Sequence, residues 1–279
     1  MNNYIKSKQY DKVKLMRKFL LLIFAGIIIF LVAGAIRTPE KVLPKALINR
    51  VTNSYEKCPD PFTFKTPIDL NKVTSILYPG QIRGGNYKAH GGFRFDGSRP
   101  DEITVYAPID AQVIAGARYP VNGEVQYTFD FEHLCGIRYR LGHLLTLSPK
   151  FQAIAEKFPL PTDLNSRTTQ VSPPIDVKQG EIIATAVGLT KGGPQTLGGY
   201  NTFVDWGVYD YRQQNEASQM PDWPTRHASE DSEWSKYYNS EIYQHAVCWF
   251  DWISEADKAK VLSLPSSDTQ SGKNSDYCK

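Results

Sequence analysis

The chain has 279 residues, of which 41% are hydrophobic and 12% aromatic, so it can build a sizeable core in one or two domains. Its formal net charge is only +3, and much of the basic excess lies before residue 20. A charge this small does not indicate a nucleic-acid partner. We therefore expect a folded protein that binds no nucleic acid.

The N-terminal region predicts a membrane anchor. Residues 19–36 form an uncharged, apolar run that is just long enough to cross a bilayer as a helix. Six basic residues and a single acidic one precede this run, so the positive-inside rule keeps the N-terminus in the cytoplasm and places the chain after Arg37 outside. A cleaved signal peptide is the alternative, because Ala33-Gly34-Ala35 fits a cleavage site. With the anchor intact, the protein is a single-pass protein of the cell membrane with an extracytoplasmic C-terminal domain.

Export changes the meaning of the four cysteines, Cys58, Cys135, Cys248 and Cys278. Their number is even, their spacing matches no zinc pattern, and an extracytoplasmic compartment permits disulfides. Three pairings are possible, and the sequence does not choose among them. Reduced, buried cysteines are the alternative.

Changes in composition divide the chain into four parts. Residues 1–37 are the basic tail and membrane segment, and the proline-rich stretch 38–75 predicts a juxtamembrane linker that gradually joins the fold. Residues 76–212 predict a β-rich domain, and 213–279 an aromatic-rich extension that ends in a loose tail. Within the extension, Ser254 and Asp257 predict the start of a helix over 255–262.

Short runs that alternate between apolar and polar residues predict the strands of the β-rich domain. Residues 103–107 and 111–115 suggest a hairpin-like unit around Pro108, and 124–131 pairs with 137–145. A helix follows Ser148-Pro149, a proline-rich loop runs through Pro174, and 177–184 predicts a turn and a strand. The last strand is predicted over 202–209.

Five segments of this domain carry a family resemblance: HGGFRFDG, TVYAPIDAQVIAG, YRLGHL, VKQGEIIATAVG and GGYNTFVDWGVYD. Their order resembles that of the lysostaphin/LytM-type zinc metallopeptidases, over roughly residues 78–212. The resemblance implies a mainly β fold, an antiparallel sheet or sandwich of the duplicated hybrid motif kind, with a groove across one sheet. The N-terminal transmembrane helix would be added to this fold. The family cleaves peptide bonds in peptidoglycan.

The resemblance also implies a set of site residues. Family members bind zinc through the His and Asp of a His-x-x-x-Asp segment and the second His of His-x-His, and two further histidines assist the attacking water. In this chain His90 matches the first ligand and His143 matches an assisting histidine. Arg94 stands in place of the Asp ligand, Phe203 in place of the other assisting histidine, and Asp205 in place of the last ligand.

These replacements predict a degenerate site, because a guanidinium cannot ligate zinc and repels it. We expect no cofactor, and we predict that Arg94 and Asp205 form an ion pair in the place of the metal. The alternative is an active zinc enzyme with an altered ligand set of His90, Asp96 and Asp205, assisted by His143. Extended backbone between residues 90 and 96 argues against this set, since six residues span roughly 20 Å.

Each candidate also has a structural interpretation. His90 could bond a carbonyl in a turn, His143 could be a core histidine, and Asp205 could be a solvated residue on an edge strand. Structural roles are also expected for three other histidines and for four tryptophans, which are more often core than a sugar-binding platform: His133, His227, His245, Trp223, Trp234, Trp249 and Trp252.

The sequence thus predicts an exported, membrane-anchored domain that binds a cell-wall peptide or regulates a cell-wall hydrolase. The first alternative is an active zinc metalloendopeptidase that cleaves peptidoglycan peptides. The second is an envelope domain with a purely structural role.

Overall fold

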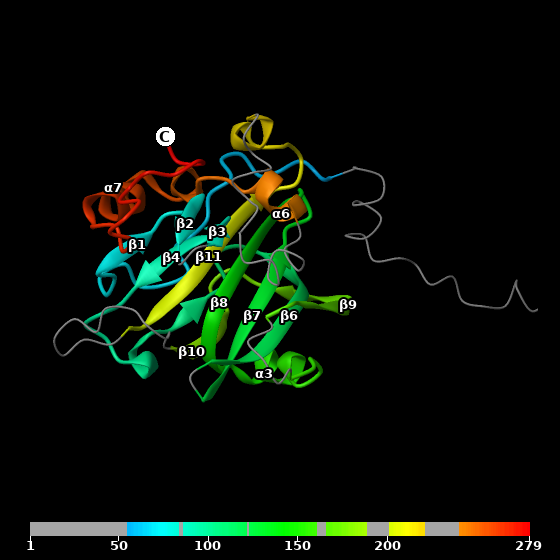
Figure 1. Ribbon diagram of the computed structural model, residues 1–279. Coiled ribbons are helices and arrows are strands. Elements are labelled where there is room, and N and C mark those ends of the chain that lie inside the picture. Colours follow the sequence, from blue (N-terminus) through cyan, green and yellow to red (C-terminus); the bar gives the residue numbers. More distant parts are fainter. Residues whose placement is uncertain (1–54, 84–85, 122, 161–165, 189–200, 221–239) are drawn as a thin grey trace, which may run out of the picture. The chain divides into compact units, whose positions relative to one another are not determined.

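A large antiparallel sheet organises the computed structural model, which describes residues 55–83, 86–121, 123–160, 166–188, 201–220 and 240–279 (Figure 1). The predicted membrane segment 19–36, Trp223, Trp234 and His227 lie outside these residues. No helix among the described residues is long and apolar enough to cross a bilayer. The domain is mainly antiparallel β-sheet with few helices, which is the fold class that the sequence predicts.

Seven strands follow one another across the sheet. Their order is β1 (Ser75–Leu77), β4 (Gly91–Arg94), β11 (Phe203–Asp210), β8 (Ile137–Leu147), β7 (Glu124–Glu132), β6 (Ala111–Val121) and β9 (Thr169–Val177). Strand β10 (Ile182–Val187) branches from β8 and pairs with β5 (Val105–Tyr106). A separate hairpin, β2 (Gln81–Arg83) and β3 (Asn86–Lys88), precedes β4.

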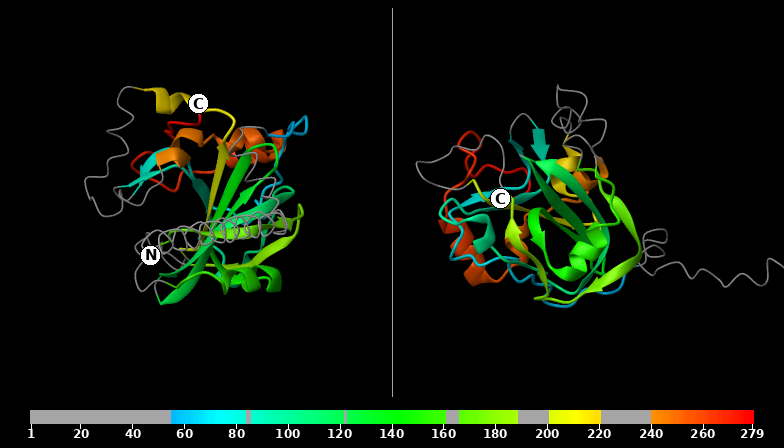
Figure 2. Two further views of the ribbon diagram at one scale, coloured as in Figure 1. Left: turned by 90° about the vertical axis from the view of Figure 1, so that its right-hand side faces the viewer. Right: turned by 90° about the horizontal axis from the view of Figure 1, so that it is seen from below.

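The helical elements are short. They are the 3-10 turns η1 (Pro100–Glu102), η2 (Glu216–Gln219) and η3 (Trp249–Trp252), and the helices α3 (Pro149–Ala155), α6 (Ser240–His245) and α7 (Glu255–Ser263). The predicted cap of α7 is confirmed, since Ser254 accepts a hydrogen bond from the backbone N–H of Asp257. In Figures 1 and 2 the orange and red C-terminal segment lies beside the cyan strands of the first half.

The core lies on one face of the sheet, because apolar residues alternate along its central strands. Val204, Trp206 and Val208 of β11 are buried. The Trp206 ring stacks on Phe93 at a centroid distance of 5.5 Å and contacts Trp249 at 4.6 Å. Trp249 is therefore a core residue, as predicted.

Two local predictions are confirmed and two are wrong. Strands β7 and β8 pair as predicted, and α3 begins after Ser148. The hairpin-like unit around Pro108 is not formed, because β5 pairs with β10 while β6 pairs with β7 and β9. The predicted loop before Pro174 contains β9, an edge strand, where prolines are tolerated because one side makes no ladder hydrogen bonds.

The end of the predicted linker, which the sequence expects to join the fold gradually, and the predicted loose tail both pack against the rest of the domain. Phe64 and Ile68 are buried in the main core, and Phe64 forms a parallel bridge with Ile253. In the tail, the Gln81 side-chain amide donates to the carbonyls of Gly272 and Asn274. Both segments contact residues that are far away in the chain, which local composition cannot indicate.

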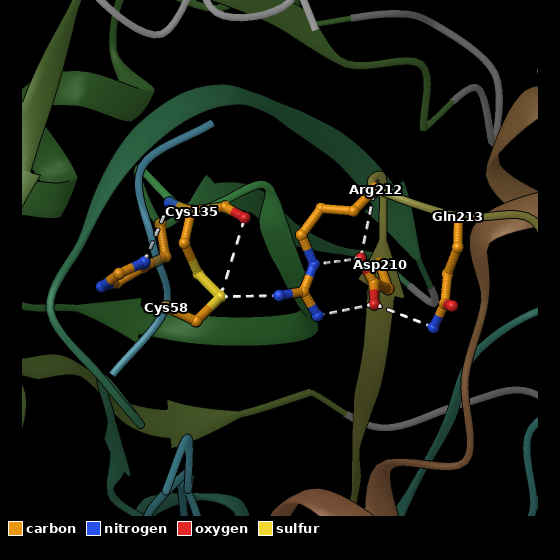
Figure 3. The surroundings of a disulfide bond; sticks show 6 residues. Cys58, Cys135, Asp210, Arg212 and Gln213 are labelled. Atoms are coloured by element: carbon orange, nitrogen blue, oxygen red, sulfur yellow. Dashed lines mark hydrogen bonds and ion pairs between the residues drawn. A yellow bond between two sulfur atoms is a disulfide. The ribbon is translucent and has the colours of Figure 1, made fainter. Parts of the chain in front are cut away.

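Two disulfides link these segments to other parts of the domain. Cys58 pairs with Cys135, and Cys248 pairs with Cys278. Figure 3 shows the first bond beside Arg212, whose Nη1 lies 2.9 Å from Cys58 Sγ. The Arg212 guanidinium is itself held by the buried carboxylate of Asp210 at 2.8 Å. Of the three pairings that the sequence allows, the structure contains this one.

Candidate functional site

The candidate site lies where β11 runs between β4 and β8, and it centres on Asp205. In the strand register Asp205 stands opposite Gly92 on β4 and Gly142 on β8. A Cβ on Gly92 would lie 2.2 Å from the carbonyl oxygen of Val204, and one on Gly142 would lie 3.3 Å from Asp205 Cβ. Glycine on both sides therefore lets the three strands approach closely and leaves the Asp205 side chain room on its face of the sheet.

Two imidazoles meet the Asp205 carboxylate. His90 Nε2 lies 3.2 Å and His143 Nε2 lies 3.3 Å from the same oxygen, Oδ2. The three side chains are between 15% and 22% exposed, so the site is largely buried but open to solvent at one side. We call these three residues the Asp205 cluster.

His143 reaches the cluster through an unusual backbone conformation. Its φ of 60° makes it the one described non-glycine residue with a positive φ, and the β7–β8 register shifts beside it. Such a conformation costs on the order of 1–3 kcal/mol and is concentrated at functional sites. Its Nδ1 lies 2.7 Å from the Oε1 of the fully buried Gln126, which fixes the ring. His143 is therefore not a simple core histidine, because both of its ring nitrogens contact polar side chains.

His90 is positioned by its backbone as well as by Asp205. It directly precedes β4, and its carbonyl oxygen accepts a hydrogen bond of 2.9 Å from Arg83 Nη2. The interpretation in which His90 lies in a turn and bonds a carbonyl is therefore wrong, because its imidazole contacts the Asp205 carboxylate. The two glycines that follow it lie within β4, where they allow close approach of neighbouring strands and of Trp249.

Burial and charge shift the protonation of the cluster. Burial lowers the pKa of His90, against the opposing effect of the Asp205 carboxylate. Burial alone would raise the pKa of Asp205, but the charges of His90 and His143 and their hydrogen bonds hold it well below its usual range. Asp205 is therefore ionised at neutral pH.

Arg94 does not take part in this cluster, so the predicted Arg94–Asp205 ion pair is wrong. Arg94 Nη2 instead binds Asp96 Oδ1 at 2.5 Å. The register explains the difference, because Arg94 stands opposite Phe203 and not opposite Asp205. The Phe203 ring contacts His143 at a centroid distance of 4.2 Å and so covers one side of the imidazole.

The alternative zinc ligands do not come together either. The second oxygen of Asp96 accepts a hydrogen bond from Thr74 Oγ1 at 3.1 Å, so Arg94 and Thr74 occupy this carboxylate. In the described residues, no group of three or more His, Cys, Asp or Glu side chains is arranged to hold a metal ion. The alternative ligand set of His90, Asp96 and Asp205 is therefore not assembled, because the Asp96 carboxylate is bound by Arg94 and Thr74.

Sequence reasoning missed the polar face of which the cluster is part. On β7 the polar residues Gln126, Thr128, Asp130 and Glu132 alternate with Tyr127, Phe129 and Phe131. Asp130 binds Arg140 of β8 through two hydrogen bonds of 2.6 and 2.8 Å, and Glu132 binds Arg138 at 2.8 Å. This period-two pattern is visible in the sequence and could have located the strand face that carries the site.

The comparisons with known proteins leave the family undetermined. No family model and no curated protein matches the chain. Among solved structures, Helicobacter pylori Csd3 from an orthorhombic crystal matches with a TM-score of 0.31 and 16% sequence identity. The match covers 54% of this chain but only 32% of Csd3, so it spans about a third of that protein. A likeness this weak defines neither the fold nor the function of this chain.

Proposed function

We propose that the chain is an exported, membrane-anchored domain that binds a cell-wall peptide at the Asp205 cluster and does not hydrolyse it. The proposal combines the sequence resemblance to peptidoglycan endopeptidases with the altered chemistry of the site. The observation that carries it is the contact of both imidazoles with one Asp205 oxygen. These groups satisfy one another, and between 15% and 22% of each side chain stays exposed to a ligand.

Hydrolysis by the family's mechanism requires a metal that lowers the pKa of a bound water. Arg94 and Asp96 neutralise each other beside β11, and Phe203 presents a phenyl ring where the resemblance places an assisting imidazole. An active zinc enzyme built on His90, Asp96 and Asp205 therefore finds no support in the geometry. Recognition of the peptide is the part of the family's chemistry that these residues can still perform.

The disulfides support the exported location. Bonds such as Cys58–Cys135 and Cys248–Cys278 persist in oxidising compartments and are rare in the cytosol. The anchor itself, residues 19–36, rests on the sequence alone.

Sedimentation with insoluble peptidoglycan tests the proposal. The full-length protein, purified in detergent with its disulfides intact, should cosediment with peptidoglycan and release no soluble muropeptides with or without added zinc. Asp205→Asn should reduce cosedimentation, whereas Lys157→Gln, a change at an exposed lysine, should not. Chelator-sensitive release of muropeptides by the unmodified protein would contradict the proposal, as would cosedimentation that Asp205→Asn leaves unchanged.

A further inference from the structure

The segment 266–279, which we call the strap, packs on the hairpin formed by β2 and β3 (Figure 1). None of its residues is fully buried, and apart from a bridge between Ser266 and Ile76 it consists of turns, bends and irregular backbone. A segment without fully buried apolar side chains opens at a low cost in free energy. The position of the strap therefore depends on its hydrogen bonds and on the disulfide between Cys248 and Cys278.

Buried side chains of the hairpin hold the strap. Gln81 is 3% exposed, and its side-chain amide donates to the carbonyl oxygens of Gly272 and Asn274 at 3.0 and 2.6 Å. Tyr87 is 6% exposed, and its hydroxyl donates to the Asp276 carboxylate at 2.9 Å. Since β2 and β3 form a two-stranded sheet of their own, these bonds also hold the hairpin in place.

The position of His90 depends on this hairpin. Arg83, the last residue of β2, donates to the carbonyl oxygens of Tyr78 and His90, the latter at 2.9 Å. Strand β3 ends at Lys88, just before His90. A hairpin that moves would therefore carry the His90 backbone with it, and the imidazole would lose its 3.2 Å contact with Asp205.

The disulfide joins the strap to a firmly packed part of the domain. Cys248 is buried, and the next residue, Trp249, lies in the main core. The backbone N–H of Val247 donates to the carbonyl oxygen of Val208 on β11 at 3.0 Å. Cys278 is only half-buried, so of the two cysteines it is the more open to a thiol reductant.

We propose that the Cys248–Cys278 disulfide is a redox switch that determines whether His90 is held at Asp205, and so whether the site binds peptide. A thiolate of a dithiol reductant attacks the Cys278 sulfur, the S–S bond breaks, and Cys248 leaves as a thiolate that takes up a proton. The second thiol of the reductant then attacks the mixed disulfide and releases Cys278, which is protonated in turn. The protein gains two electrons and two protons, and the reductant becomes a disulfide.

Opening the bond leaves the strap with its hydrogen bonds alone, and water competes for these. The strap then detaches from Gln81 and Tyr87, and the hairpin loosens together with His90. This inference rests on the proposed peptide-binding function and adds the regulation of the same site.

Hydrogen exchange measured by mass spectrometry tests the structural part on the full-length protein. After reduction with dithiothreitol, backbone amides of residues 80–90 should exchange faster, while those of β7 should keep their protection. Cys248→Ser combined with Cys278→Ser should show the same fast exchange without reductant. Gln81→Met removes both donors to the strap with the disulfides intact, so it should also speed exchange in the hairpin.

Cosedimentation with insoluble peptidoglycan tests the effect on the site. In a variant with Cys58→Ala and Cys135→Ala, Cys248–Cys278 is the one remaining disulfide, and dithiothreitol should reduce binding about fivefold or more. The variant with Cys248→Ser and Cys278→Ser is the matched control. It should bind weakly from the outset and should not respond to dithiothreitol.

The outcomes separate this inference from the proposed function. Unchanged exchange in residues 80–90 after loss of Cys248–Cys278, or with Gln81→Met, would overturn the switch. Faster exchange with unchanged cosedimentation would also overturn it and leave peptide binding intact. A response of the serine control to dithiothreitol would assign the effect to Cys58–Cys135 and overturn the switch as well. If the oxidised protein binds no peptidoglycan, the proposed function is refuted, and hydrogen exchange alone decides whether the disulfide holds the hairpin.

Discussion

Replacing Asp205 with Asn tests how the cluster is held together. The change keeps the size of the side chain and removes the charge that both imidazoles contact at 3.2 and 3.3 Å. Removing one member of a buried charged pair costs about 3–5 kcal/mol, but these side chains keep 15–22% of their surface in water. We therefore expect a loss of about 2–3 kcal/mol in the free energy of unfolding at pH 7.

The same prediction has a pH dependence with a definite sign. The pKa of Asp205 is lowered in the folded state, so its contribution is present above the unfolded pKa of about 3.9 and is lost as the pH falls through the folded value. The pKa of His90 is also lowered, so below about pH 6.5 the unfolded state takes up its proton first and stability falls. Both effects make the unmodified protein less stable on acidification.

Denaturant unfolding of the two proteins between pH 8 and pH 2 measures both quantities. The gap in unfolding free energy between the unmodified protein and Asp205→Asn should persist down to about pH 4 and should narrow below it, as the pH approaches the folded-state pKa of Asp205. A gap below about 0.5 kcal/mol at pH 7, the range of ordinary surface substitutions, would refute the reasoning. A gap that does not narrow below about pH 4 would refute the assigned direction of the Asp205 pKa shift.

Two further changes test the framework around the cluster. Gly92→Ala should prevent close approach of β4 and β11, since its Cβ would lie 2.2 Å from the Val204 carbonyl oxygen, and the expected result is loss of soluble protein or a large drop in thermal midpoint. Normal stability would show that the strands can separate. Replacing Cys58 and Cys135 together with Ala should cost about 2–5 kcal/mol of unfolding free energy. An unchanged midpoint would mean that the bond does not hold residues 55–75 to the sheet.

Local features of the fold could be predicted from the sequence because neighbouring residues determine them. The β7–β8 pair and the Ser254 cap of α7 arise from alternation and from a short capping pattern. The burial of Phe64 and the packing of the tail on Gln81 could not, since these contacts join segments that are far apart in the chain. The cysteine pairing was open for the same reason.

For the candidate site, the sequence could name candidate residues but not the contacts that they make. The resemblance selected His90, His143 and Asp205, which the structure brings together. It could not show that Arg94 binds Asp96, because that choice depends on which residue stands opposite Arg94 in the neighbouring strand.

Restoring the three family residues tests whether the backbone of a metal site survives. Residues 94, 203 and 205 lie on one face of β4 and β11, because paired residues share a face and alternate residues repeat it. His90 already contacts position 205, so Arg94→Asp, Phe203→His and Asp205→His together would place two imidazoles and a carboxylate near one point. The variant should retain zinc after dialysis, and zinc should raise its thermal midpoint.

Zinc content by elemental analysis and melting with and without the metal provide the measurement. The matched control is Phe203→His with Asp205→His but with Arg94 kept, because its guanidinium still repels the cation and leaves Asp96 occupied. The control should therefore retain far less zinc than the triple variant. If a folded triple variant holds no more zinc than this control, the chain has lost the geometry of a metal site as well as its ligands. In that case the strand positions inferred for residues 94 and 205 relative to His90 would have to be revised.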